Sequence, residues 1–314
     1  MGISTTRAAG IDIGKAFLDA ALHPSGQAMR VPNDSDGCRR LIDWLHGHGI
    51  ARVGLEASGG YEREVLAALR GAGFEAALLQ PRQVRAFATY RLRLAKNDRL
   101  DAALIAECTA ALESVRDAPD PRLEPLAEHL RLIEQIEADL ARLKTRAEAY
   151  RTPRLKRWLA RESERLSRQL KAELALLANQ VVRHRDLAER LRLIESIDGI
   201  GRRTALTLLI LMPELGRIES GQAASLAGLA PFDRESGKYS GQRRIQGGHR
   251  RVRRSLFAAA LAASFRWNPA LVDLYQRLRA KGKAHKQALT ACARKLLIFA
   301  NAVLKRGSQW NTAR

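Results

Sequence analysis

Short apolar runs and amphipathic segments alternate along the first third of the chain. The apolar runs have the length of strands, and a glycine or proline follows most of them; they cover residues 8–13, 17–22, 27–31, 52–57 and 74–79. Helical spacing of apolar residues fills the segments between and after them, the last of these at about residues 82–94 and 98–112. Three strands followed by alternating helices and strands predict an α/β domain with a mixed sheet over residues 1–118.

The middle of the chain carries two longer amphipathic stretches. A proline-rich linker at residues 115–125 precedes leucines and isoleucines at helical spacing, Thr152-Pro153 interrupts this pattern, and a second leucine stripe follows. Narrow apolar seams with charged flanks predict a helical coiled-coil spacer over residues 119–188, either as an antiparallel hairpin or between molecules. An ordinary helical core layer is the alternative; the charged flanks favour a homo-oligomer, a dimer or tetramer.

The remaining residues, 189–314, predict a mainly α-helical domain. Near its start, the segment Asp198-Gly199-Ile200-Gly201 lies between two helical patterns, which is typical of a helix-hairpin-helix. The turn of such a motif presents backbone N–H groups to phosphate, and Arg202 and Arg203 add positive charge. A tight turn that serves packing alone is the alternative.

A glycine-punctuated segment follows Pro231 and continues into a helix at Arg250. Residues 234–254 contain eight Lys or Arg and one acid, which predicts a phosphate-binding surface. We expect the phosphate contacts to come from Arg243, Arg244, Arg250, Arg251 and Arg254. A serine among such cations is a candidate nucleophile toward phosphorus, and the chemistry alone does not choose between Ser236 and Ser240.

The net charge is more informative about the protein's partners than the rest of the composition. Lys and Arg total 54 against 33 Asp and Glu, a formal net charge of +21, which indicates a polyanionic partner, with nucleic acid the default. Cys38, Cys108 and Cys292 lie far apart, so we expect reduced, partly buried thiols rather than a disulfide framework or zinc site. No apolar run approaches the length of a membrane span, so we expect a cytoplasmic, nucleoid-associated protein.

Four acids in the first domain suggest a metal site. Asp12 interrupts an apolar strand, where an unpaired carboxylate is costly, and Glu56 ends another strand. Asp98 and Asp101 share a helix face, and four carboxylates could hold Mg²⁺ or Mn²⁺ for phosphodiester chemistry. Each acid has a plainer explanation: Asp98 and Asp101 could pair with neighbouring cations, and Glu56 could stabilise the N-terminus of the next helix.

These residues together resemble the DEDD transposases of bacterial insertion sequences, of the IS-one-ten type and related to the Piv DNA invertases. The N-terminal resemblance lies in Gly10-Ile11-Asp12, Glu56-Ala57-Ser58-Gly59 and Asp98-Arg99-Leu100-Asp101-Ala102. The C-terminal resemblance lies in residues 196–204 and in the Gly- and Arg-rich residues 232–254. The resemblance extends over nearly the whole chain.

The resemblance implies an RNase H-like (RuvC-like) first domain in which Asp12, Glu56, Asp98 and Asp101 are catalytic and bind Mg²⁺. It also implies a catalytic serine in a Glu-Ser-Gly step after a Gly-Leu-x-Pro segment, which favours Ser236 over Ser240. Members of such a family join DNA to this serine as a 5′-phosphoserine. A structured RNA encoded by the element bridges donor and target DNA, and subunits are thought to share the active site.

We therefore expect a Mg²⁺-dependent transposase or site-specific DNA recombinase that cleaves and rejoins DNA. A Holliday-junction-resolving endonuclease is the first alternative, in which the same acids activate water. A non-catalytic nucleic-acid scaffold, built on the helix-hairpin-helix and the basic segment, is the second. The first alternative predicts that Ser236 is dispensable for cleavage, and the second that Asp12 is dispensable for function.

Overall fold

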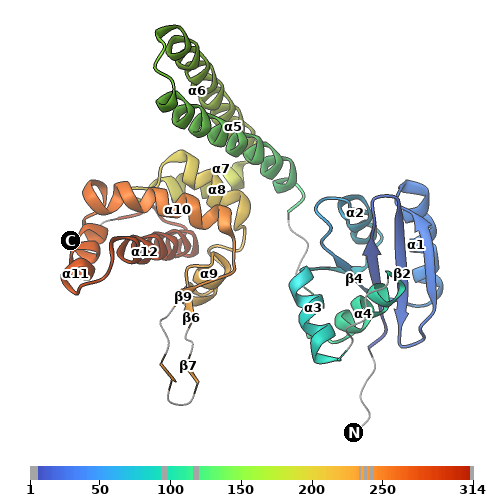
Figure 1. Cartoon of the computed structure of the whole chain (residues 1–314). Helices are drawn as coiled ribbons and strands as arrows, with labels where there is room; N and C mark the ends of the chain where they lie inside the picture. The colour runs from blue at the N-terminus through green and yellow to red at the C-terminus, as the bar shows by residue number, and fades with distance from the viewer. Residues whose placement is uncertain are drawn as a thin grey trace. The chain divides into compact units, whose positions relative to one another are not determined.

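A computed structural model describes residues 6–92, 98–115, 120–232, 235–236, 239–240 and 244–311, with the backbone alone at residues 98–100, 235–236 and 239–240. The chain divides into two compact units, Met1–Ala118 and Pro119–Arg314 (Figure 1). Each unit has a hydrophobic core of its own.

The first unit is built on a five-stranded sheet. Its strands are β1 (Ala8–Ile13), β2 (Phe17–His23), β3 (Ala28–Pro32), β4 (Arg52–Glu56) and β5 (Glu75–Leu79). They lie in the order β3-β2-β1-β4-β5. The pairs β3–β2 and β2–β1 are antiparallel, and the pairs β1–β4 and β4–β5 are parallel. The predicted mixed sheet is confirmed, and β1 lies at its centre.

Four helices accompany this sheet: α1 (Ser35–Gly47), α2 (Arg63–Gly71), α3 (Pro81–Tyr90) and α4 (Asp98–Ala110). Asp34 caps the first helix, because its carboxylate accepts a hydrogen bond from the Gly37 N–H at 2.8 Å. The third helix is shorter than predicted, since α3 ends at Tyr90. The turn between β1 and β2 follows the carboxyl end of β1, next to Asp12. The loop after β4 follows the carboxyl end of that strand, next to Glu56.

Helix α4 packs directly on the sheet through two glycines. A Cβ on Gly10 of β1 would lie 2.1 Å from the backbone N of Ala106 and 2.3 Å from the Ala102 carbonyl oxygen. A Cβ on Gly54 of β4 would lie 1.8 Å from Thr109 Oγ1. Gly10 and Gly54 are partners in the register of β1 and β4, so α4 crosses both strands at one level. The absent side chains let the helix backbone approach the sheet this closely.

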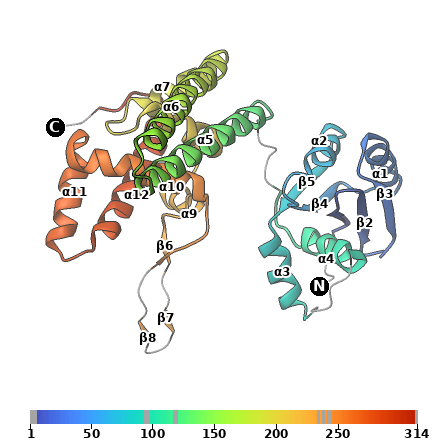
Figure 2. The same cartoon turned by 45° about the horizontal axis from the view of Figure 1, so that its top comes forward.

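The second unit is helical, as predicted. It contains α5 (Leu123–Ala149), α6 (Pro153–Val182), α7 (Arg185–Glu195), α8 (Arg202–Leu211), α9 (Ser220–Leu226), α10 (Arg250–Ala262), the π-helix η1 (Ala263–Trp267), α11 (Pro269–Ala280) and α12 (His285–Arg306). Helices α5 and α6 form a hairpin within the chain, which matches one of the two arrangements predicted for this segment (Figure 2). Leu130 and Ile133 of α5 and Leu177 of α6 belong to the same hydrophobic cluster as Leu296 of α12.

Helix α12 is the core helix of this unit. Within the described part of the chain it is the one helix long and apolar enough to cross a membrane, which the sequence analysis did not foresee. Cys292, Ala293, Leu296 and Leu297 are fully buried within the unit, and the helix packs on α10 and α11. Its apolar character is therefore explained by its place in the core.

The three cysteines are buried and free, as predicted. Burial raises the pKa of the Cys38, Cys108 and Cys292 thiols. They therefore behave as small apolar side chains.

Two short two-stranded sheets, together called the ribbon below, lie in the glycine-punctuated segment between α9 and α10. Strand β6 (Pro231–Phe232) pairs with β9 (Arg244–Ile245), and β7 (Glu235–Ser236) pairs with β8 (Tyr239–Ser240), both antiparallel. Figure 2 shows β6 near α9 and β7 and β8 at the far end of the ribbon from the helices of this unit. The glycines lie outside the paired residues, so they do not prevent pairing.

Candidate functional site

Asp12 lies in the central strand on the face covered by α4. Gly10 faces α4, and because side chains alternate along a strand, Asp12 two residues later faces the same side. The side chain is partly buried, and Oδ1 accepts a hydrogen bond from the Ile13 N–H at 2.9 Å. The acid thus projects just past the point where α4 touches the strand.

Glu56 occupies the equivalent position in the neighbouring strand, β4. Gly54 faces α4, and Glu56 follows it by two residues. The parallel register pairs Gly10 with Gly54 and Ile11 with Leu55, so its next step places Asp12 beside Glu56. Two Gly-x-acid triplets, Gly10-Ile11-Asp12 and Gly54-Leu55-Glu56, therefore bring two carboxylates to one face of the sheet.

Asp101 lies in the first turn of α4, the helix that packs on this face. Asp101 is partly buried and precedes Ala102, whose carbonyl oxygen is among the atoms closest to Gly10. Asp98 opens the same helix, but its side chain lies outside the described residues. The described side chains contain no group of three or more acids, histidines or cysteines already placed to hold a metal ion. The register thus brings Asp12 and Glu56 together, whereas grouping of Asp101 with them remains a prediction.

Asn33 and Glu62 support the two loops beside these acids, and the sequence analysis missed both. The Asn33 side-chain amide donates to the carbonyl oxygens of Gly14 at 2.9 Å and Tyr61 at 3.3 Å, so it joins the turn after Asp12 to the loop after Glu56. The Glu62 carboxylate accepts hydrogen bonds from the Ser58 N–H, the Ser58 hydroxyl and the Gly60 N–H. Burial opposes its charge, yet these bonds hold the pKa of Glu62 below its ordinary value.

Asp19 is a further acid close to Asp12 that the sequence analysis did not single out. It is the direct partner of Asp12 across β1 and β2. Arg30 donates to both Asp19 carboxylate oxygens, at 2.7 and 2.8 Å, and so offsets its charge. The alternation of the second strand could have located this acid, because Asp19 also interrupts an apolar run.

Ser236 and Ser240 lie on the paired strands β7 and β8. Ser236 pairs with Tyr239, and Ser240 pairs with Glu235. Two residues outside the described part of the chain separate the strands. The backbone thus places the two serines on opposite strands of one ribbon, at adjacent register positions.

The base of this ribbon is clamped by backbone contacts and one arginine. Gly228, with φ +67°, and Gly248, with φ +63°, lie so close that a Cβ on Gly248 would meet the Gly228 nitrogen at 2.2 Å. The Arg253 guanidinium Nη1 donates to the carbonyl oxygens of Gly247 at 2.7 Å and Gly228 at 3.2 Å. The His249 N–H donates to the Leu226 carbonyl at 2.8 Å. Arg253 therefore joins the two arms of the ribbon where they leave the helices.

Replacing Arg253 by alanine is expected to loosen this clamp. Two carbonyl oxygens lose a charged donor, which costs about 2 kcal/mol of local stability. Hydrogen exchange at the His249 amide should become faster, and DNA cleavage should slow. The exposed Arg277 on α11 offers a control, since Arg277→Ala should change neither measurement; unchanged His249 exchange in Arg253→Ala would contradict the clamp.

The seven arginines predicted to contact phosphate fall into three groups: four are exposed, one lies outside the described residues, and two bind carboxylates of α5. Arg244, Arg250 and Arg254 are exposed, and Arg254 lies 3.7 Å from Glu134 with 65% of its side chain exposed. Arg202 is exposed at the start of α8 and donates to Glu195 at 2.8 Å. Arg243 lies outside the described residues.

Arg203 and Arg251 form the third group and bind carboxylates of α5. Arg203 donates to both Glu137 oxygens, at 2.8 and 2.9 Å, and lies against Thr207. Arg251 donates to Glu134 at 2.7 Å. Burial opposes the charge of Arg203, yet the bonds to Glu137 hold the pKa of its guanidinium above the ordinary value. Both arginines already join α8 and α10 to α5, so their role as phosphate contacts remains a prediction.

The turn between α7 and α8 is a tight helix–turn–helix connection. Gly199 has φ +94°, and a Cβ there would lie 2.3 Å from the Ala263 Cβ. The Asp198 carbonyl accepts a hydrogen bond from the Asn268 amide at 3.0 Å. The glycine is thus required for packing, and the turn's use as a helix-hairpin-helix stays a prediction.

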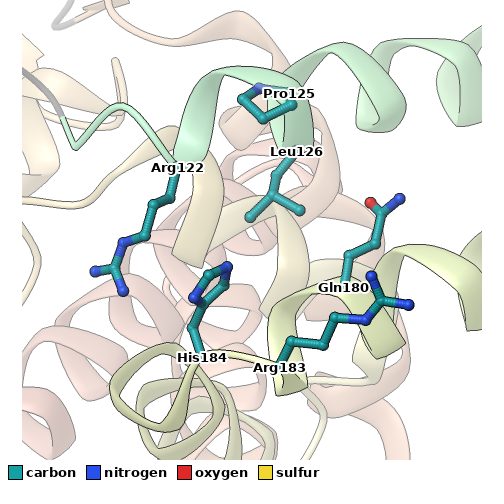
Figure 3. Close-up of a pocket in the computed structure, with 6 residues that line it drawn as sticks. All are labelled: Arg122, Pro125, Leu126, Gln180, Arg183 and His184. Carbon is teal, nitrogen blue, oxygen red and sulfur yellow. The ribbon is translucent and has the colours of Figure 1, made fainter.

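A pocket of about 300 Å³ lies at the base of the α5–α6 hairpin and is apart from the predicted site residues (Figure 3). It is lined by Arg122, Pro125, Leu126, Gln180, Arg183 and His184. Arg122 also bonds Asp120 at 2.6 Å and Asp186 at 2.7 Å, and this guanidinium holds the pKa of both carboxyls below their ordinary range. The pocket therefore lies beside a structural ion pair.

Comparison with known families defines the class of protein. Residues 9–150 match a family described as a DEDD transposase of the IS110 type, and residues 191–276 match the family described as "Transposase IS116/IS110/IS902 family". The acids of the first unit and the ribbon of the second fall within these two matches. The chain is thus a DNA transposase, an enzyme that cleaves and rejoins DNA. It belongs to the IS110/IS116 family of transposases.

The chain is similar to the following proteins and solved structure. A pilin gene-inverting protein of Moraxella lacunata is 28% identical, with 94% of this chain and 95% of that protein aligned. An uncharacterized protein of insertion element IS110 from Streptomyces coelicolor is 36% identical over 117 residues, 37% of this chain and 29% of that protein. T. thermophilus RuvC, solved with a Holliday junction substrate, aligns with 32% of this chain and 91% of its own at 17% identity, with a TM-score of 0.26.

Proposed function

We propose that this transposase cleaves DNA with Ser236 as the nucleophile and with divalent metal held by acids of the first unit. The observation that carries the proposal is the pair of Gly-x-acid triplets, which places Asp12 and Glu56 side by side on the face that α4 covers. Two adjacent, partly buried carboxylates at the carboxyl ends of neighbouring strands repel each other, and a bound cation would offset that repulsion. The mixed sheet with such acids on its central strands supports an RNase H-like first unit.

The donor set fits a hard divalent cation. Asp12, Glu56 and Asp101 supply carboxylate oxygens, which Mg²⁺ and Mn²⁺ prefer, and Asp98 is the fourth proposed ligand. Such an ion stabilises the charge that develops on a phosphate during displacement. Asn33 and Glu62 would hold the turn after Asp12 and the loop after Glu56 in place, so that the carboxylates keep their positions when the negative DNA backbone approaches.

Ser236 would attack the scissile phosphate. Its Oγ forms a bond to phosphorus, the bond from phosphorus to the 3′ oxygen breaks, and the serine proton ends on that 3′ oxygen. The product is a 5′-phosphoserine and a free 3′ hydroxyl, and reversal with a second 3′ hydroxyl rejoins DNA without an external energy source. Arg243, Arg244, Arg250 and Arg254 would position the DNA backbone around the serine, with Arg202 at the α7–α8 turn as a second contact.

Three further parts of the proposal follow the family. A structured RNA encoded by the element would bridge donor and target DNA, and the net charge of +21 suits two polyanions. A dimer or tetramer would bring the acids of one subunit to the serine of another. Because one relative is a pilin gene-inverting protein, we include inversion of a DNA segment among the reactions that the same chemistry would perform.

The experiment that tests the proposal is incubation of labelled element-end DNA with Mg²⁺, with and without RNA from the flanking non-coding region. Denaturing electrophoresis should show DNA that migrates with the protein. Cleaved DNA without attached protein would instead support a junction-resolving endonuclease, in which the acids activate water.

Replacing Asp12 by asparagine separates the enzyme from a non-catalytic scaffold. The change keeps size and removes charge, so cleavage should fall by roughly 10³-fold while DNA binding persists. Asp43 on the exposed face of α1 is a matched control, because Asp43→Asn should leave cleavage unchanged. Full cleavage by Asp12→Asn would exclude Asp12 as a metal ligand.

A further inference from the structure

An exposed stripe of side chains runs along α10 into η1. Arg250, Arg254, Ala258, Leu261 and Phe265 are all exposed and follow one another at intervals of three or four residues. This spacing places them on one face of a helix. The stripe begins beside the clamp of the ribbon, and Figure 1 shows α10 leading from there toward α11. At 1.5 Å per residue, Arg254 and Phe265 are roughly 16 Å apart.

The stripe ends in three rings that come from three different elements. Phe265 of η1 is 55% exposed, and its ring centroid lies 5.0 Å from that of Tyr275 in α11 and 6.3 Å from that of His285 in α12. The Tyr275 hydroxyl and His285 Nδ1 form a hydrogen bond of 2.7 Å. These contacts hold the rings in place while a large part of the Phe265 ring faces water. A fixed, exposed ring is suited to stack against another flat aromatic group.

Positive charge surrounds the rings. Arg279 lies one helical turn after Tyr275, and its Nη1 donates to the Lys283 carbonyl at 2.6 Å. Lys281, Lys283 and Lys286 are exposed on either side of His285. The ion pairs found among the described residues include none of these four cations. Asp273 is the only acid in the sequence from residue 250 to residue 311, so this charge calls for an anionic partner.

We propose that this face binds an unpaired nucleic-acid strand, with a base stacked on Phe265 and phosphates held by Arg254 at one end and by Arg279 and Lys283 at the other. Bases in a duplex stack on each other and present only their edges, whereas an unpaired base can stack on a protein ring. The distance along the stripe corresponds to about five stacked nucleotides. A second copy of the chain is a poorer occupant, because it would bring the same positive charge.

This inference rests on the proposed function, because the strand would be the one that continues from the ribbon that carries Ser236. Its test avoids the chemistry. Binding of a labelled single strand of about twelve nucleotides is measured by fluorescence anisotropy in EDTA, as DNA and as RNA of the same sequence, beside the matching duplex. The variants are Phe265→Leu, which keeps apolar volume but removes the ring, and Phe265→Tyr, which keeps the ring.

Phe265→Leu should weaken binding of the single strand roughly tenfold, and Phe265→Tyr should retain it. Leu176→Ala removes an exposed apolar side chain from α6 and should change nothing. Lys283→Glu should reduce by about one the slope of the logarithm of affinity against the logarithm of salt concentration. The strand, DNA or RNA, that shows the larger loss in Phe265→Leu identifies the source of the bound bases.

Two results would overturn the inference. Unchanged single-strand affinity in Phe265→Leu is one, and an equal loss for the duplex, which would indicate a general basic surface, is the other. If the unchanged affinity in Phe265→Leu is accompanied by a changed sedimentation coefficient, the face belongs to a protein partner. None of these results depends on the protein–DNA adduct. If the protein forms no adduct but Phe265→Leu weakens single-strand binding, the proposal of Ser236 as nucleophile is wrong and the proposal of this binding face stands.

Discussion

A protein with Ser236 replaced by alanine is expected to bind element-end DNA and form no covalent adduct with it. The change removes one oxygen atom from the second residue of β7 and leaves the backbone pairing with Tyr239 available. Removal of a nucleophile that acts as part of a catalytic set costs about 10⁶-fold in rate in other enzymes, so a loss of at least about 10³-fold is expected here. Denaturing electrophoresis of labelled DNA measures it.

Ser240 is the matched control for this experiment. It is the same residue type on the facing strand of the same ribbon, and it pairs with Glu235. Ser240→Ala should therefore form the adduct at nearly the normal rate. If Ser236→Ala cleaves and becomes attached while Ser240→Ala does not, the two serines exchange roles. If neither variant loses the adduct, the nucleophile lies elsewhere in the chain.

Replacing Gly10 by alanine should cause a large loss of stability in the first unit. The new Cβ would lie 2.1 Å from the Ala106 nitrogen and 2.7 Å from the Ile105 carbonyl carbon. These are backbone atoms inside a helix, so the clash can be relieved only by moving α4 away from the sheet. Such overpacking costs about 3 kcal/mol, which would lower the melting temperature of this unit by roughly 10 °C.

Hydrogen exchange on the full chain can locate this effect. Protection should fall in β1 and α4, while α10 and α12 in the second unit should keep theirs. Gly47 at the end of α1 is the control, because a Cβ there would meet nothing within 4 Å, and Gly47→Ala should be neutral or slightly stabilising. Normal protection of α4 in Gly10→Ala would show that the helix does not pack on the strand through this glycine.

The Gly10 prediction also bears on activity. Asp101 precedes Ala102, one of the residues closest to Gly10, so a displaced α4 would carry Asp101 away from Asp12 and Glu56. Cleavage should therefore fall in Gly10→Ala even at temperatures where the unit stays folded. This would distinguish a glycine needed for the position of an acid from one needed only for stability.

Much of the fold could be predicted from the sequence because local patterns determine it. Short apolar runs located the five strands, and Thr152-Pro153 located the break between α5 and α6. The short ribbon between α9 and α10 was missed. Its described strands are two residues each, which is too short for a periodic pattern, and its clamp depends on Arg253 and Gly228, which are distant in sequence.

The residues of the candidate site likewise divide into those that local sequence patterns reveal and those that only tertiary contacts reveal. Asp12 and Glu56 stood out because an acid interrupts or ends an apolar strand. Asn33 was not recognised, because its importance comes from bonding two carbonyl groups that are 47 residues apart in sequence, at positions 14 and 61. The burial of Arg203 was also not foreseen, since a charge count cannot tell an arginine that faces solvent from one that binds Glu137. Tertiary contacts decide both cases.

The clamp at the base of the ribbon has an evolutionary consequence. Arg253 binds carbonyl oxygens of the main chain, and Gly228 and Gly248 touch through backbone atoms, so the attachment of the ribbon does not depend on the side chains that the ribbon carries. Residues between positions 232 and 244 other than Ser236 can therefore be exchanged among descendants of this gene while the anchor is preserved. Selection could in this way change which DNA ends are accepted without rebuilding the helical scaffold.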